Sequence, residues 1–124
     1  MRKLLLLLAL AAFSALSPTT YAAGLQVTEV KLGKGIQDRE ITEEATTFAV
    51  NDKVFLVVKL SGGPSDPIQV SWKVGANSDN VTLKVGGDPW RTWSSKTAWR
   101  AGDWTVTISD SGGQVLKEVT FKVQ

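Results

Sequence analysis

The sequence predicts an all-β fold, an antiparallel sandwich of about seven strands with an immunoglobulin-like plan, and a small β-barrel is the alternative. Three observations predict it. After Gly24 no window repeats apolar residues at helical spacing over three turns, whereas apolar and polar residues alternate in several short runs. Gly, Pro, Asn and Asp bound these runs, as they do in turns. Trp72 falls on the third strand, where such sandwiches carry a core tryptophan.

The first half of the domain contains three alternating runs. Residues 25–32 alternate with one change of phase, which indicates a β-bulge. Residues 53–61 (KVFLVVKLS) form the most apolar run and predict a central strand. In residues 68–74 the apolar side chains, Trp72 among them, fall on one face, because alternate residues of a strand point the same way. The segment GGPSDP before this run predicts a turn.

The segment 33–51 is poorly patterned, and we expect at most a short edge strand of undefined register there. The apolar residues available to that strand are Ile36, Ile41, Phe48 and Val50. No stronger prediction follows for this part of the chain.

The second half continues the alternation. Residues 81–85 predict a short strand that ends at a Gly-Gly pair, and Pro89 introduces a further strand over residues 90–96. Residues 104–108 alternate again, with Trp104 on the apolar face. The sequence DSGG at residues 110–113 then closes a hairpin onto residues 116–123.

Residues 1–22 have the features of a secretory signal peptide, and residues 23–124 are expected to form one domain. Two basic residues precede an apolar run over residues 4–16, and small residues follow, so we expect cleavage after Ala22 or Ala23. The alternative is a membrane anchor. An apolar helix of this length rises only about 20 Å, whereas the hydrocarbon core is about 30 Å thick. The sequence therefore predicts an exported protein, periplasmic or extracellular, with no membrane span after cleavage of the leader.

Composition narrows the range of functions. The chain has no cysteine and no histidine. These absences exclude disulfides, thiolate metal sites, cysteine nucleophiles and histidine general bases. Without the two basic residues of the leader, twelve basic and twelve acidic residues remain, so no nucleic-acid partner is expected.

Three spaced blocks in the second half carry a family resemblance. They are the run WRTWSSK at residues 90–96, the strand GDWTV at residues 102–106, and a hairpin with Asp110, Gly113 and Val115-Leu116. Their order and spacing resemble the uncharacterised bacterial family catalogued as domain of unknown function 2914, over roughly residues 70–123. Members of that family often have a histidine at the position of Val70. The resemblance implies the fold and export, and it supplies no activity.

Five tryptophans in so small a domain suggest a binding surface. Trp72 and Trp104 share faces with aliphatic residues and are predicted to lie in the core. The candidate surface for a ligand or partner comprises Trp99, Trp90, Trp93, Arg91 and Arg100. Exposed indole rings stack on sugars and on peptide side chains, and arginine adds cation–π contacts or hydrogen bonds. The alternative is that these rings only cover the open end of the sandwich. We expect Trp99 to be the most exposed and Trp90 the next.

Other candidate sites have ordinary structural explanations. Ser94 and Lys96 form a Ser-x-Lys pair, but their spacing is that of a strand and no second motif accompanies them. We therefore expect both to be outward polar residues of an edge strand. The cluster at residues 77–80 (NSDN) lacks the spacing of a calcium loop, so we expect a turn and no metal.

The sequence thus predicts an exported, non-enzymatic binding module without a catalytic residue or cofactor. A protein partner in the cell envelope is the favoured ligand. A carbohydrate- or peptidoglycan-binding module that uses surface tryptophans is the alternative, and a small enzyme is the least favoured reading.

Overall fold

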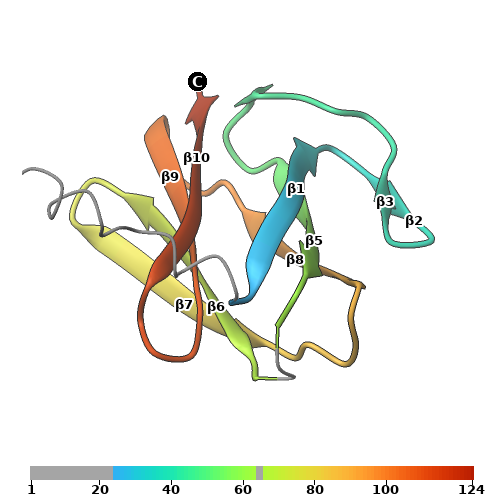
Figure 1. Ribbon diagram of the computed structural model, residues 1–124. Helices are drawn as coiled ribbons and strands as arrows, with labels where there is room; N and C mark the ends of the chain where they lie inside the picture. The colour runs from blue at the N-terminus through green and yellow to red at the C-terminus, as the bar shows by residue number, and fades with distance from the viewer. Residues whose placement is uncertain (1–23, 64–65) are drawn as a thin grey trace, which may run out of the picture.

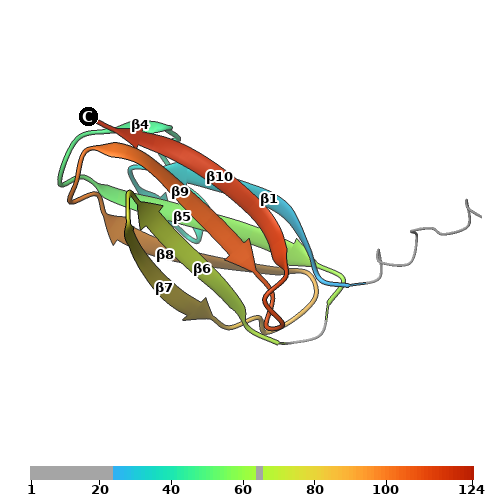
Figure 2. The ribbon, with the colours of Figure 1, turned by 90° about the vertical axis from the view of Figure 1, so that its left-hand side faces the viewer.

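The computed structural model describes residues 24–63 and 66–124, which form two packed β-sheets and a small hairpin (Figures 1 and 2). The strands are β1 (Gln26–Gly33), β2 (Ile36–Gln37), β3 (Glu40–Ile41), β4 (Thr47–Phe48), β5 (Lys53–Ser61), β6 (Ile68–Val74), β7 (Asn77–Leu83), β8 (Trp90–Thr97), β9 (Gly102–Ser109) and β10 (Val115–Val123). In these residues there is no helix, and no sheet closes into a barrel. The predicted sandwich is confirmed, and the barrel alternative is wrong.

The long strands divide into two sheets, as in a β-sandwich. One sheet has the order β1-β5-β8, and the other has the order β4-β10-β9-β6-β7. Figure 1 shows the five-stranded sheet to the left of the three-stranded one. The strands within each sheet pair antiparallel, except that β4 runs parallel to the end of β10. No helix in the described part of the chain is long and apolar enough to cross a membrane.

The long strands follow the sequence alternation closely. β5 has the predicted bounds and is the central strand of its sheet. The register between β1 and β5 shifts between Val27 and Glu29, where the change of phase indicated a bulge. The predicted signal peptide, residues 1–22, lies outside the described residues.

The segment 33–51 differs from the expected single edge strand. β2 and β3 pair with each other as a separate hairpin, and β4 pairs with β10 instead. Phe48 of β4 is 2% exposed and belongs to the core, whereas Val50 is exposed. Each of these strands has only two residues, which is too few to show an alternation of apolar and polar side chains. Sequence analysis therefore could not locate them.

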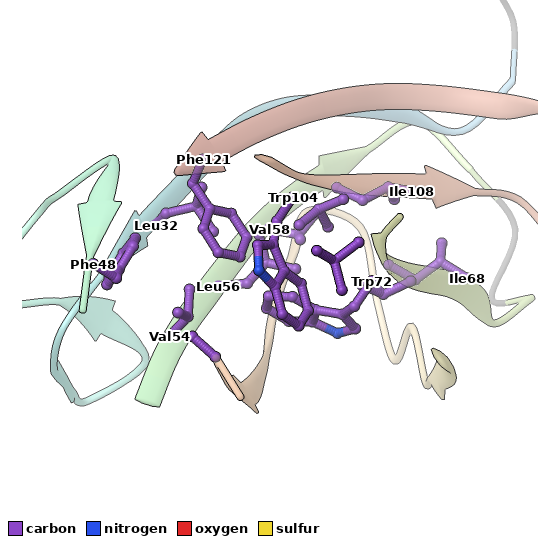
Figure 3. Packing of buried hydrophobic residues seen from close by; sticks show 14 of the residues in the cluster. Leu32, Phe48, Val54, Leu56, Val58, Ile68, Trp72, Trp104, Ile108 and Phe121 are labelled. Atoms are coloured by element: carbon purple, nitrogen blue, oxygen red, sulfur yellow. The ribbon is translucent and has the colours of Figure 1, made fainter. Parts of the chain in front are cut away.

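Aromatic rings fill the centre of the core (Figure 3). Trp72 and Trp104 are each 1% exposed. The ring of Phe121 stacks on Trp104 with centroids 5.6 Å apart, and it meets Trp72 edge-on at 6.2 Å and Phe48 edge-on at 5.3 Å. Four of the five strands of this sheet, all except β7, therefore contribute to one aromatic cluster.

Candidate functional site

The outer face of the three-stranded sheet carries an exposed tryptophan. Trp93 of β8 is 44% exposed and lies directly opposite Val57 of β5. Directly opposed residues share a face, and the inward positions of β5 are taken by core residues, so both point away from the five-stranded sheet. The ring of Phe55 lies 6.4 Å from that of Trp93, centroid to centroid. Val57 is only 3% exposed, so this outer face has its own small apolar layer.

The hairpin of β2 and β3 lies against the same sheet, with β3 in contact with β1 and β5. It approaches so closely at Gly33 that a Cβ atom there would lie 2.5 Å from the backbone oxygen of Glu43 and would collide with Ile41. Only glycine allows this approach. On the other side of the hairpin, the carboxylate of Glu40 forms an ion pair with the guanidinium of Arg91, with 3.1 Å between Oε2 and a guanidinium nitrogen. The hairpin is therefore fastened to both β1 and β8.

A groove of about 580 Å³ opens beside the hairpin, and we call it the basic groove. Three cationic side chains from three different elements converge on it: Arg39, Lys59 and Arg91. The remaining residues that line it are Thr28, Leu60, Ser61, Pro89 and Trp90. A flat indole and several cations in one groove suit a ligand that is both anionic and planar or apolar.

Trp90 is held in place at the end of this groove. Its Nε1 donates a hydrogen bond to the carbonyl of Lys84 at 3.0 Å. Its ring packs on the backbone at Gly86, where a Cβ atom would lie 2.7 Å from the ring. The guanidinium of Arg39 lies 5.9 Å from the centroid of the indole, in cation–π geometry. The indole therefore presents a fixed face to the groove.

The charges of the basic groove are only partly compensated. Lys59 pairs with Glu29 at 3.4 Å, and Arg91 pairs with Glu40 at 3.1 Å. A hydrogen bond from Lys31 lowers the pKa of Glu29, so this carboxylate stays ionised. Among the described residues Arg39 has no acidic partner; its guanidinium donates only to the carbonyl of Arg91, at 3.5 Å. The groove therefore keeps an excess positive charge.

Arg39 is placed by a strained turn. It and Asp38 are the two central residues between β2 and β3, and their φ angles are 61° and 53°. A two-residue hairpin turn with both φ angles positive normally contains Asn-Gly or Asp-Gly, because other residues in the left-handed region cost about 1–2 kcal/mol each. Arginine at this position therefore carries a backbone cost, while its side chain contacts Trp90 and Arg91.

Trp99 and Arg100 lie away from the basic groove, after the opposite end of β8. Trp99 is 46% exposed and meets Trp104 edge-on, with ring centroids 6.2 Å apart. Arg100 extends over the turn at Gly75. Trp99 borders a second depression of about 220 Å³ between the edge strands β7 and β8, which we call the lateral hollow. The residues that line it are Trp72, Val74, Asn77, Ser78, Asp79, Lys96, Trp99 and Trp104.

The structure thus divides the candidate surface predicted from the sequence. Arg91 and Trp93 lie on the outer face of the three-stranded sheet, opposite Lys59 and Val57. Trp90 stands opposite the core residue Leu60, so it packs against the core from the inner face and still lines the basic groove. Trp99 and Arg100 lie elsewhere. The expectation that Trp90 is the second most exposed tryptophan is wrong. Trp93 is more exposed, because the ring of Trp90 is covered by the loop at Gly86 and by Arg39.

Sequence reasoning missed Arg39 and Lys59. Their convergence on Arg91 depends on the pairing of β5 with β8 and on where the hairpin of β2 and β3 folds back. The one local signal is the pair Asp38-Arg39, in which aspartate favours a turn.

Ser94 and Lys96 correct another expectation. They lie on an edge strand, as expected, but they face inward, since they stand opposite Leu56 and Val54 of the core. Lys96 reaches the lateral hollow and pairs with Asp79 of β7 at 2.5 Å. Residues 77–80 are part of β7 and not a turn, because they pair with β6. Nowhere in residues 24–63 and 66–124 do three acidic side chains gather where they would hold a metal ion.

Comparison with known proteins bears on the second half of the chain. No curated protein is similar enough to count as a match. One family model matches residues 66–123, which contain β6 to β10 and therefore all residues of the lateral hollow, together with Trp90, Arg91 and Trp93. Arg39 and Lys59 lie before the matched segment. The predicted resemblance is confirmed: the C-terminal part of the chain matches the family described as "Protein of unknown function (DUF2914)".

Proposed function

We propose that the protein is an exported, non-enzymatic β-sandwich that binds a protein partner of the cell envelope through the outer face of its three-stranded sheet. The observation that carries the proposal is the presence of an exposed tryptophan, Trp93, and of the basic groove on that one side. Tryptophan and arginine are the residues most enriched at the energetic centres of protein interfaces. The excess positive charge at Arg39 favours a partner that presents an acidic segment.

The strained turn supports the same assignment. Non-glycine residues held in the left-handed region cluster at functional sites. Here the strain places the guanidinium of Arg39 over Trp90 and at the mouth of the groove. The absence of histidine and cysteine from the sequence also supports binding over catalysis.

Two substitutions test the surface without disturbing the core. Arg39→Gly removes the guanidinium and fits the positive φ, so it is expected to change the free energy of unfolding by no more than about 1 kcal/mol. Trp93→Ala is expected to cost about 1 kcal/mol, since the ring is largely exposed. Each is expected to weaken partner binding by about 2 kcal/mol, roughly 30-fold. The measurement is retention of envelope proteins on the immobilised protein, with an oligoglutamate peptide as the defined acidic probe in solution.

Val115→Ala is the matched control, because Val115 is 55% exposed but lies on the other sheet. It should retain the same envelope protein and bind the peptide as wild type does. Peptide binding should also weaken as salt rises, because the groove attracts the peptide by charge. The proposal fails when Arg39→Gly and Trp93→Ala retain partner and peptide as well as the control does.

Export is tested separately. If residues 1–22 are a signal peptide, the protein recovered from the envelope or medium should begin at Ala23 or Gly24. N-terminal sequencing of that protein measures this directly. Recovery of membrane-bound material that still begins with Met1 contradicts export by cleavage and favours the anchor.

A further inference from the structure

One residue that lines the lateral hollow has a buried donor without a partner. Trp72 lines the hollow and is 1% exposed, yet its Nε1 makes no hydrogen bond to any described residue. The two other indoles that are not exposed have partners: Trp90 donates to the carbonyl of Lys84 and Trp104 to that of Arg100, at 3.0 and 2.9 Å. Buried polar groups in proteins are nearly always hydrogen-bonded, so an orphaned N–H group calls for an acceptor from outside the chain.

Trp99 forms an aromatic wall of the same hollow, and its position is fixed. Its edge-on contact with Trp104 orients the ring, and Trp104 is itself held through Nε1. The preceding residue, Ala98, is fully buried and exchanges backbone hydrogen bonds with residues 51–52 at 2.7 and 2.8 Å. Because these contacts already hold the loop and the ring, the indole can stack on a ligand ring with little loss of conformational entropy.

The polar rim of the hollow carries no net charge. Asp79 and Lys96 pair with each other across the two edge strands, so they neutralise each other while both keep atoms that can bond a ligand. Asn77 adds an amide, which both donates and accepts. A ligand for this rim has to be uncharged and rich in groups that donate and accept.

We propose that the lateral hollow binds a single neutral sugar ring, with one face of the ring on Trp99 and a hydroxyl oxygen accepting from Nε1 of Trp72. The face of a pyranose is apolar and stacks on indole, whereas its rim of hydroxyls suits Asn77, Asp79 and Lys96. The volume of about 220 Å³ is smaller than that of pockets for larger ligands and has room for one such ring. This site shares no residue with the basic groove and is independent of the partner proposed above.

Titration with glucose and with N-acetylglucosamine tests the site, with the indole N–H signals of ¹⁵N-labelled protein as the readout. The signals of Trp72 and Trp99 are expected to move in saturable fashion with one common Kd, and the signal of Trp93 is expected to stay in place. Trp99→Ala is expected to weaken binding at least about tenfold and to keep the fold, since Trp99 is exposed. Trp72→Phe removes the donor and keeps an aromatic ring at this position, and it is expected to weaken binding as well.

Trp93→Ala is the matched control, an exposed tryptophan outside the hollow, and it should bind the sugars as wild type does. Cyclohexanol has a six-membered ring with a single hydroxyl group, and it should bind at least about tenfold more weakly. The proposal is overturned if no saturable shift of the Trp72 and Trp99 signals occurs. Unchanged affinity in Trp99→Ala, or tighter binding of cyclohexanol, would also overturn it.

Discussion

Trp72→Ala is expected to lower the free energy of unfolding by about 3–5 kcal/mol, the range for truncation of a large buried aromatic residue. Trp72 is 1% exposed and packs edge-on against Phe121, in the centre of the core. Both sheets surround it, and strands fixed by backbone pairing on either side cannot move in to fill the space. The loss is a large part of the roughly 5–15 kcal/mol that holds a domain of this size together.

Unfolding by urea, followed by circular dichroism, measures this loss. Trp93→Ala serves as the comparison, because it removes the same side chain from an exposed position and should cost about 1 kcal/mol. The loss of stability in Trp72→Phe should lie between these two losses. Phenylalanine leaves a smaller cavity than alanine does, and the substitution also removes an N–H group that has no partner in the described part of the chain. A loss below about 1 kcal/mol for Trp72→Ala would contradict the inward register of β6.

The burial of Trp72 was predictable from the sequence, and the reason is geometric. A strand that packs one face on the core alternates apolar and polar residues with a period of two, and β6 does so over its whole length. The same rule gave the bounds of β5 and the inward face of β9. In each case the evidence lies within one continuous run of residues.

The basic groove was not predictable because its evidence is spread over three runs. Arg39, Lys59 and Arg91 come together only after β5 pairs with β8 and the hairpin of β2 and β3 folds onto the sheet. The hairpin strands have two residues each, too few to show a period. The inward position of Lys96 was missed for a related reason. A lysine on an edge strand normally points to solvent, and here the charge of Asp79 on another sheet offsets the cost of turning it inward.

Phe121→Ala is also expected to lower the free energy of unfolding by about 3–5 kcal/mol, although no pattern in the sequence places Phe121 at the centre of the core. Three aromatic rings contact it, and they come from β4, β6 and β9. Removal of the ring leaves Phe48 and Trp72 without their aromatic contact and leaves Trp104 with the contact to Trp99 alone. Phe121→Leu keeps part of the volume and is the milder variant for a protein that does not fold with alanine.

The contact between the rings of Phe121 and Phe48 leads to a prediction about what holds β4 in place. This two-residue strand is held to β10 by few backbone hydrogen bonds, including those from Lys122 to Thr46 and from Gln124 to Phe48, each 2.9 Å long. We therefore expect the edge-on ring contact, with centroids 5.3 Å apart, to supply much of its attachment. In a double-mutant cycle of Phe48→Leu and Phe121→Leu, the coupling should be about 0.5–3 kcal/mol, as for residues in contact.

Phe55→Leu with Phe121→Leu is the control pair, because Phe55 lies on the outer face of the other sheet, and these two losses should simply add. If the losses of stability also add for Phe48→Leu with Phe121→Leu, then backbone pairing alone, and not the contact between the rings, holds β4 to the sandwich.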